Sequence, residues 1–277
     1  MEHGFGSIPS PKDIRDYKLN TETMYQKINS KAVVIPDTYK LTTVPIKNQG
    51  IFPTCVAHAL SEIVEFHNKR QSGKFSKFST EFIYGCRFEG DYDGEGMYIR
   101  DALKVIKSYG DVLYTVLPGN SYVQAARSKV LGNFDELKVE AYPNRVSNYY
   151  RLYGETEVKY AIVKNGPVVA GMWWYSGATL DDKHVYTYDK NADKSGHAVL
   201  IVGWDNENWI IQNSWGGAWG DKGLFKIPIN KSFDEVFYEV YGVNDNITDI
   251  KTPSKFIEKI SPAINSILNT LKKWFKK

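Results

Sequence analysis

A cysteine at the start of a predicted helix is the residue whose position most favours chemistry. Cys55 follows the loop 45–54 and opens a run, 55–70, in which apolar residues recur at helical spacing, with Thr54 as the expected N-cap. Cysteine attacks as the thiolate, and the exposed amides and partial positive charge at a helix start stabilise that anion. Cys55 is therefore a candidate nucleophile, although its position alone leaves a structural thiol open.

A nucleophilic cysteine needs a base and a group that orients the base. His197 stands at the entrance to the apolar run 198–204, and Asn213 ends the next β-prone run, 208–212. Two antiparallel strands joined by the turn at 203–207 would bring the two side chains together. The asparagine amide could then fix the imidazole, as the third member of a catalytic triad does.

The elements that must position these residues change character along the chain. Helical patterns come first, and we expect helices at 21–29, 55–70 and 99–109. After about residue 138 the β-prone runs dominate, interrupted by one helix at 155–165. The expected strands are 138–142, 168–174, 198–204, 208–212, 224–229 and 237–243. A helical half followed by a sheet half predicts an α+β fold of two packed lobes with a site in their cleft.

Five segments, in order, resemble the papain family of cysteine peptidases. They are Ile35-Pro-Asp37, Pro45-Ile-Lys-Asn-Gln49-Gly50, Lys164-Asn-Gly-Pro-Val168, Gly196-His197-Ala-Val199 and Asn213-Ser-Trp-Gly-Gly-Ala-Trp-Gly220. The histidine and asparagine follow Cys55 at separations close to the roughly 130–150 residues of papain-type enzymes. The resemblance covers about residues 35–243.

The resemblance implies a papain-like two-lobed fold and a thiol protease. A peptidase domain, 35–246, would hold a helical left lobe at about 45–138 and an antiparallel, barrel-like right lobe at about 139–246, with the active site in the cleft. The implied activity is that of a cysteine endopeptidase, which hydrolyses peptide bonds of peptide or protein substrates through a thioester acyl-enzyme at Cys55.

The family's functional residues transfer to matching positions of this chain. Cys55 would form a thiolate–imidazolium pair with His197, Asn213 would orient the imidazole, and Gln49 would donate to the oxyanion. Two tryptophans would support them: Trp215 would cover the bond between His197 and Asn213, and Trp219 would border the leaving-group side. The candidate substrate-binding residues are Gly96, Met97, Tyr98 and Ile99.

Several positions depart from the family pattern. Met97 stands where a glycine is usual, which puts the family's usual contacts to the substrate strand in doubt. Phe52 replaces a cysteine that normally forms a disulfide, and we expect Cys86 to be a free structural thiol. The other histidines do not cluster with further ligands, so we expect no metal and no cofactor.

Composition narrows the partners. The 277 residues carry a net charge of +3, but residues 251–277 hold seven lysines and one glutamate. The body is therefore acidic, which argues against nucleic-acid binding. Two cysteines imply no oxidising compartment, and the start of the chain has no apolar signal core. We expect a monomer made in the cytoplasm, with release or surface association left open.

Both ends leave alternatives open. Residues 1–34 form an N-terminal extension that either straps across the cleft and restrains activity or packs without effect. In the tail, 247–277, apolar residues recur at helical spacing among the lysines, which is typical of a basic amphipathic helix. Such a helix could dock on its own domain, contact a membrane or anionic surface, or bind a protein.

Three other functions compete with peptide hydrolysis. A catalytically silent papain fold could bind peptides or target a membrane or other surface, although silent relatives usually lose the cysteine, histidine or glutamine. The tail could be membrane-active, with the peptidase domain carrying or releasing it. Transpeptidation would use the same acyl intermediate.

Overall fold

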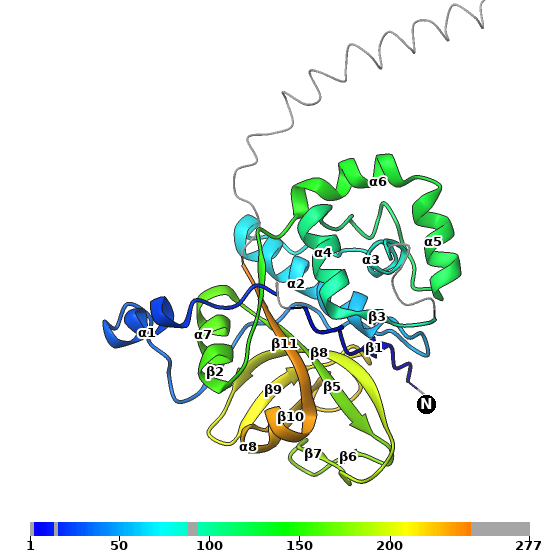
Figure 1. Ribbon diagram of the computed structural model, residues 1–277. Coiled ribbons are helices and arrows are strands. Elements are labelled where there is room, and N and C mark those ends of the chain that lie inside the picture. Colours follow the sequence, from blue (N-terminus) through cyan, green and yellow to red (C-terminus); the bar gives the residue numbers. More distant parts are fainter. Residues whose placement is uncertain (1–2, 14–15, 88–93, 245–277) are drawn as a thin grey trace, which may run out of the picture. The chain divides into compact units, whose positions relative to one another are not determined.

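The computed structural model describes residues 3–13, 16–87 and 94–244 (Figure 1). These residues form a lobe of helices, which lies at the top of Figure 1, and a lobe built on an antiparallel sheet. The predicted α+β, two-lobed fold is therefore confirmed. The predicted tail helix lies outside the described residues. Within them, no helix is both long and apolar enough to cross a membrane.

Helix α2 is the central element of the helical lobe. Every residue from 55 to 65 is buried, and the helix ends at Gly73, whose φ of 71° is the left-handed conformation that glycine adopts readily. Leu60 and Ile63 of α2 share one apolar core with Ala198 and Leu200 of the sheet, so the same core joins both lobes. The elements of this lobe are α2 Cys55–Ser72, α3 Thr80–Gly85, β3 Met97–Tyr98, α4 Ile99–Ser108, α5 Val123–Leu131, α6 Phe134–Ala141 and the 3₁₀ turn η1 Tyr142–Asn144.

The second lobe is built on a sheet whose strand order is β10-β9-β8-β5-β11-β4, with β2 also paired to β8. All these neighbours are antiparallel. Central strand β8 has a long buried run, as expected of a strand covered on both faces. The elements are β2 Tyr39–Lys40, β4 Tyr149–Arg151, α7 Glu155–Asn165, β5 Val168–Tyr175, β6 Thr179–Leu180, β7 Tyr186–Thr187, β8 Lys194–Trp204, β9 Asn208–Gln212, β10 Leu224–Pro228, α8 Ile229–Lys231, the π-helical turn η2 Ser232–Val236 and β11 Phe237–Val243.

Most predicted elements are confirmed, but one is wrong. The helix at 155–165 and the strands at 208–212 and 237–243 have the predicted bounds. Residues 138–142, predicted as a strand, instead lie mostly in helix α6. The reason is the helical spacing of the buried residues. Leu137 and Ala141, four residues apart, are buried on one face, whereas Val139 and Tyr142 are exposed.

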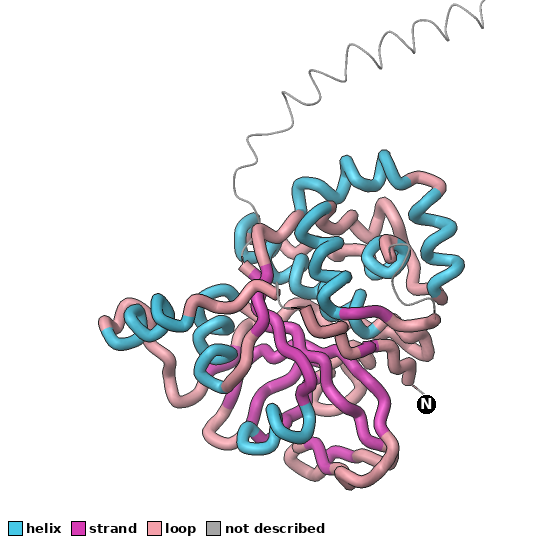
Figure 2. Tube along the Cα trace, viewed as in Figure 1, coloured by secondary structure: helices cyan, strands magenta, loops and turns pink. Residues whose placement is uncertain are grey.

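The first residues of the chain run between the two lobes (Figure 2). We name residues 3–10 the N-terminal strap. Its strand β1, Ser7–Ile8, pairs in parallel with β3, and the Gly6 carbonyl accepts a hydrogen bond of 2.7 Å from the Met97 amide. A Cβ on Gly6 would overlap the backbone of Pro53. The strap can therefore lie this close only because glycine has no side chain. Helix α1, Thr21–Asn29, follows it along the chain and matches the prediction.

Candidate active site

The candidate nucleophile stands at the first residue of α2. Cys55 is fully buried, and the backbone of Ala198, the residue after His197, lies within hydrogen-bonding reach of its sulfur, as does the backbone of Gly6 in the strap. Thr54 is the N-cap residue, but its side chain caps no amide and its hydroxyl donates to Asn120 Oδ1 instead. The amides at the start of α2 are therefore not screened by a side-chain cap next to the sulfur.

The candidate base is held in one tautomer by its neighbours. His197 Nε2 lies 2.8 Å from Asn213 Oδ1, and the same oxygen accepts a 2.8 Å hydrogen bond from the Ser214 amide. Because a carbonyl oxygen only accepts, the proton of the neutral imidazole is on Nε2. Nδ1 then carries the lone pair, and it has no hydrogen-bond partner among the described residues. The imidazole is therefore prepared to accept a proton at Nδ1.

Aromatic rings enclose this pair of side chains. Trp215 stacks on His197 with ring centroids 4.8 Å apart, and Trp219 packs edge-on against Trp215 at 4.9 Å. Trp174 of β5, which the motifs did not select, also packs on Trp215, with ring centroids 4.7 Å apart. Trp215 is thus placed to keep water from the bond between His197 and Asn213, where a lower local dielectric strengthens it.

Gln49 is tied to both lobes. Its side-chain oxygen accepts from the Ser214 hydroxyl at 2.6 Å, and its backbone amide donates to the Ser214 carbonyl at 2.9 Å. Asn120 Nδ2 donates to the Gln49 carbonyl at 2.8 Å. The side-chain NH₂ group of Gln49, the expected oxyanion donor, bonds to the carbonyl oxygens of Gly4 at 2.8 Å and Phe52 at 2.9 Å. A strap carbonyl therefore lies where the oxyanion is expected.

A buried ion pair anchors the loop that carries Gln49. Lys47 Nζ lies 2.9 Å from Glu65 Oε1 and 2.6 Å from Ser61 Oγ, and the Lys47 amide donates to Glu62 Oε1. Burial raises the pKa of Glu62 to about 8, so this carboxyl holds its proton at neutral pH. The Lys47 carbonyl accepts from the Gly216 amide, which connects the same loop to the Trp215 segment. Sequence reasoning missed Lys47, Asn120 and Ser214; only Lys47 and Ser214 lie within the motifs that carried the resemblance.

The titration of the pair differs from the expected thiolate–imidazolium. Burial raises the pKa of the Cys55 thiol to about 11, although hydrogen bonds from backbone groups oppose the shift. Burial also lowers the pKa of His197 to about 4, and the bond to Asn213 only partly offsets it. Both groups are therefore neutral at pH 7 with the strap in place. The physical reason is desolvation by burial, and Gly6 and Phe5 of the strap are among the residues that cover the two side chains.

The candidate substrate-binding residues divide into two groups. Gly96, with φ of 100°, lies against the Gly6 carbonyl; Met97 and Tyr98 pair with Ser7 and Ile8. Ile99 is different, because it begins α4 and is fully buried in the helical core. The strand edge to which a peptide could pair is therefore limited to Met97 and Tyr98, and the strap already pairs with it.

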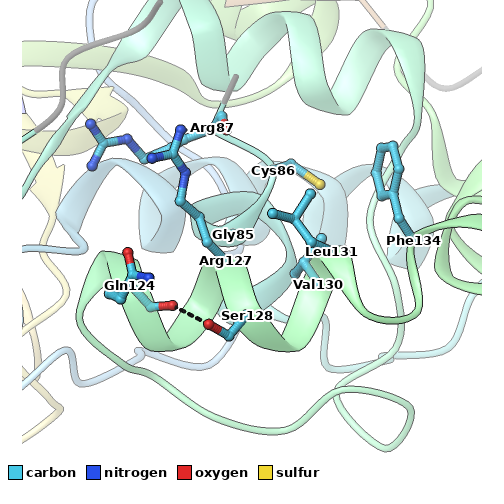
Figure 3. A pocket seen from close by; sticks show the side chains of 9 residues that line it. All are labelled: Gly85, Cys86, Arg87, Gln124, Arg127, Ser128, Val130, Leu131 and Phe134. Atoms are coloured by element: carbon cyan, nitrogen blue, oxygen red, sulfur yellow. Dashed lines mark hydrogen bonds between the residues drawn. The ribbon is translucent and has the colours of Figure 1, made fainter. Parts of the chain in front are cut away.

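The remaining candidate groups lie away from this site or pack in the core. His58 and His67 are buried in α2, and both cysteines are free thiols. A cavity of about 450 Å³ opens in the helical lobe beside Cys86 (Figure 3). Arg87 and Arg127 lie at one side of it and Phe134 at the other. Within the described residues, no group of three or more potential metal ligands occurs.

Comparisons with known proteins identify the family and support the fold. The chain is 27% identical over 205 residues to cathepsin K of Mus musculus; the match covers 68% of this chain and 57% of that protein. Among solved structures, xylellain, a cysteine protease from Xylella fastidiosa, superposes with a TM-score of 0.74 at 24% identity, covering 89% of this chain and 97% of the other. A procathepsin B from Trypanosoma congolense gives 0.66 at 17% identity, covering 88% and 87%. The family model described as papain family cysteine protease matches residues 36–247, and the chain therefore belongs to that family.

Proposed function

We propose that this protein is a cysteine endopeptidase that cleaves peptide or protein substrates through a thioester at Cys55. The observation that carries the proposal is the imidazole of His197, whose Nε2 is held 2.8 Å from Asn213 and whose Nδ1 is left as the acceptor, while the backbone of the next residue, Ala198, lies within hydrogen-bonding reach of the Cys55 sulfur. That arrangement does the work of a base that is oriented by a third group.

The residues perform the reaction in two halves. His197 Nδ1 takes the thiol proton, the Cys55 sulfur attacks the carbonyl carbon, and the oxyanion accepts from Gln49 Nε2 and the Cys55 amide. The imidazolium gives its proton to the leaving amine as the C–N bond breaks, which leaves the thioester. Water then attacks the thioester with His197 as base, and the acid product and the thiol are restored.

The N-terminal strap holds this machinery closed. The Gly4 carbonyl accepts from the side-chain amide of Gln49, and the Gly6 backbone lies within hydrogen-bonding reach of the Cys55 sulfur. The ring of Phe5 packs edge-on against His197 with centroids 5.8 Å apart. His3 stacks on Trp215 at 4.3 Å. A substrate carbonyl needs the same places, so the strap and a substrate exclude each other. Residues 1–34 thus act as an inhibitory segment.

A second function, peptide binding without turnover, is favoured by the neutral, desolvated state of the pair. The test is the rate at which an epoxide that alkylates active thiolates modifies Cys55 in the full chain, followed by mass mapping. The peptidase proposal expects reaction at Cys55 faster than at free cysteine once the strap is displaced, and loss of that reaction in His197→Ala. Cys86 is the internal control, because burial raises its pKa and it should stay unmodified. A displaced strap with a Cys55 no faster than free cysteine would establish the silent alternative.

A further inference from the structure

The most informative contact of the strap is the one that buries Ser7. This serine is 4% exposed, and the hydroxyl of Tyr238 on β11 donates to its Oγ at 2.6 Å. Ser7 is also the strap residue that pairs with Met97, one position beyond the glycine at the Cys55 sulfur. A small polar side chain therefore fills a pocket next to the candidate nucleophile.

The same pocket must receive a substrate side chain. The strap pairs with the strand edge at Met97 and Tyr98, and its Gly4 carbonyl accepts from the side-chain amide of Gln49. A peptide that reaches the sulfur and uses this edge has its backbone on the path of the strap. One of its side chains then points into the place of the Ser7 side chain, because alternate residues of an extended chain face the same side.

The wall of this pocket is a tyrosine ring in a fixed position. Tyr238 lies over Gly171 of β5, where an added Cβ would overlap its ring, whereas a Cβ added to Gly196 of β8 would overlap the Ser7 carbonyl of the strap first. The ring of Trp173 packs on the Tyr238 ring with centroids 4.6 Å apart. Gly171 makes room for the phenol ring, so Tyr238 occupies the space next to Ser7 that a larger ligand side chain would need.

We propose that Tyr238 is a specificity-determining residue that restricts the subsite at Ser7 to small side chains and favours a hydroxyl. The inference rests on the proposed function for its catalytic consequence, but the size restriction itself is a property of the pocket. The hydroxyl of a serine or threonine accepts a hydrogen bond from the Tyr238 hydroxyl. Leucine or phenylalanine overlaps the ring and leaves the phenol without its acceptor, which costs binding energy in a buried place.

The first test does not need turnover. In the full chain, Ser7→Leu should displace the strap, whereas Ser7→Thr should keep it, with displacement read as the rate of Cys55 modification by iodoacetamide. Adding Tyr238→Ala should let leucine fit and return the Ser7→Leu chain to slow modification. The proposal is wrong if Ser7→Leu reacts as slowly as the parent, or if Tyr238→Ala does not restore the slow rate.

The second test reads the specificity of the open enzyme. In full-length Gly6→Val protein, in which the strap cannot seat, a fluorogenic peptide library varied one position at a time should show one position that prefers serine, threonine or alanine over leucine by about tenfold or more. Tyr238→Ala should reverse that preference, and Tyr238→Phe should remove only the advantage of serine over alanine, about fivefold. The matched control is Tyr188→Phe, which removes a hydroxyl bonded to Glu235 away from the strap.

The outcomes separate the two proposals. No hydrolysis by Gly6→Val, together with the expected result for Ser7→Leu and its rescue, would overturn the peptidase and retain the pocket. Hydrolysis with a preference for leucine at every position, unchanged by Tyr238→Ala, would overturn the pocket and retain the peptidase.

Discussion

Replacing Gly6 by valine should convert the closed protein into an open one. The Cβ of any larger residue at position 6 would overlap the backbone of Pro53, which cannot move aside as a flexible side chain could. The catalytic residues are untouched by the change, so the open enzyme is the same in parent and variant. Any difference in rate then reports how firmly the parent strap closes.

The hydrogen bonds of the strap set the expected size of the effect. Among the hydrogen bonds of the strap, three are made by the backbone of Gly4 and Gly6 next to the substituted position: Gly4 amide to Gly50 carbonyl at 3.1 Å, Gln49 side-chain amide to Gly4 carbonyl at 2.8 Å, and Met97 amide to Gly6 carbonyl at 2.7 Å. At about 1 kcal/mol net for each bond, these three favour closure by about 3 kcal/mol. Since about 1.4 kcal/mol is a factor of ten, roughly one parent molecule in 150 is open. The variant should therefore gain about a hundredfold in kcat/KM.

Two assays on the full-length proteins should agree. Hydrolysis of quenched peptides and alkylation of Cys55 both require the open state, so both should rise by the same factor in Gly6→Val. Gly154→Val is the matched control, because a Cβ there meets nothing within 4 Å. Equal rates in parent and Gly6→Val, with both proteins folded, would refute the reasoning that the strap inhibits.

Three further predictions concern the groups around the sulfur, each measured in the Gly6→Val protein unless stated. Asn213→Ala removes the 2.8 Å bond to His197 and should lower kcat/KM for peptides about 10- to 100-fold, as loss of a hydrogen bond to a charged group does; an unchanged value would deny Asn213 its orienting role. Gln49→Ala should lower kcat about 10²- to 10³-fold with KM little changed, and a change in KM alone would contradict an oxyanion donor. Acid should open the strap of a Cys55→Ala protein that keeps Gly6, in which the imidazole has no thiolate partner, because the closed state holds His197 neutral with its pKa at about 4 against an ordinary 6.5. The stability that this gives closure is present above pH 6.5 and is lost as the pH falls towards 4, so hydrogen exchange of residues 3–10, corrected for its intrinsic pH dependence, should speed up over that range.

The sequence predicted the elements whose signals are local. The helix at 155–165 ends before a Gly-Pro pair, and the strands at 208–212 and 237–243 are β-prone runs bounded by turns, so their bounds needed no tertiary information. The strand prediction for residues 138–142 was wrong because an alternating run of five residues fits a strand and a helix equally well. The burial of Leu137 and Ala141, four residues apart, decided in favour of the helix.

The residues of the candidate site also divide into those that local motifs select and those that only the folded structure brings in. The motif spacing was enough to select His197 and Asn213, whose side chains lie in contact, and Gln49, which the same Ser214 joins to them. No periodicity marks the strap, because Gly4, Gly6 and Ser7 enter the cleft through small size and backbone bonds. A two-residue strand paired to a partner about ninety positions away leaves no pattern in a local window. Tyr238 was missed for a related reason, since its neighbours Gly171 and Gly196 come from two other strands.

The proposed inhibition by the strap and the raised pKa of the thiol have one physical cause. An ion pair between Cys55 and His197 needs either water or strong partners to offset the cost of two buried charges. In the closed protein the Gly6 backbone of the strap offers the sulfur a hydrogen bond, but burial outweighs it, the Gly4 carbonyl occupies the side-chain amide of Gln49, and Phe5 packs on the imidazole. The neutral pair is then the lower-energy form, which is why the thiol pKa rises while that of His197 falls. Removing the strap readmits water to both groups and frees Nδ1 to take the proton, so exposing the cleft and charging the nucleophile are a single event. This coupling requires that, in Gly6→Val, the pH midpoint of thiolate formation at Cys55, read as ultraviolet absorbance against a matched Cys55→Ala protein, falls well below that of the parent.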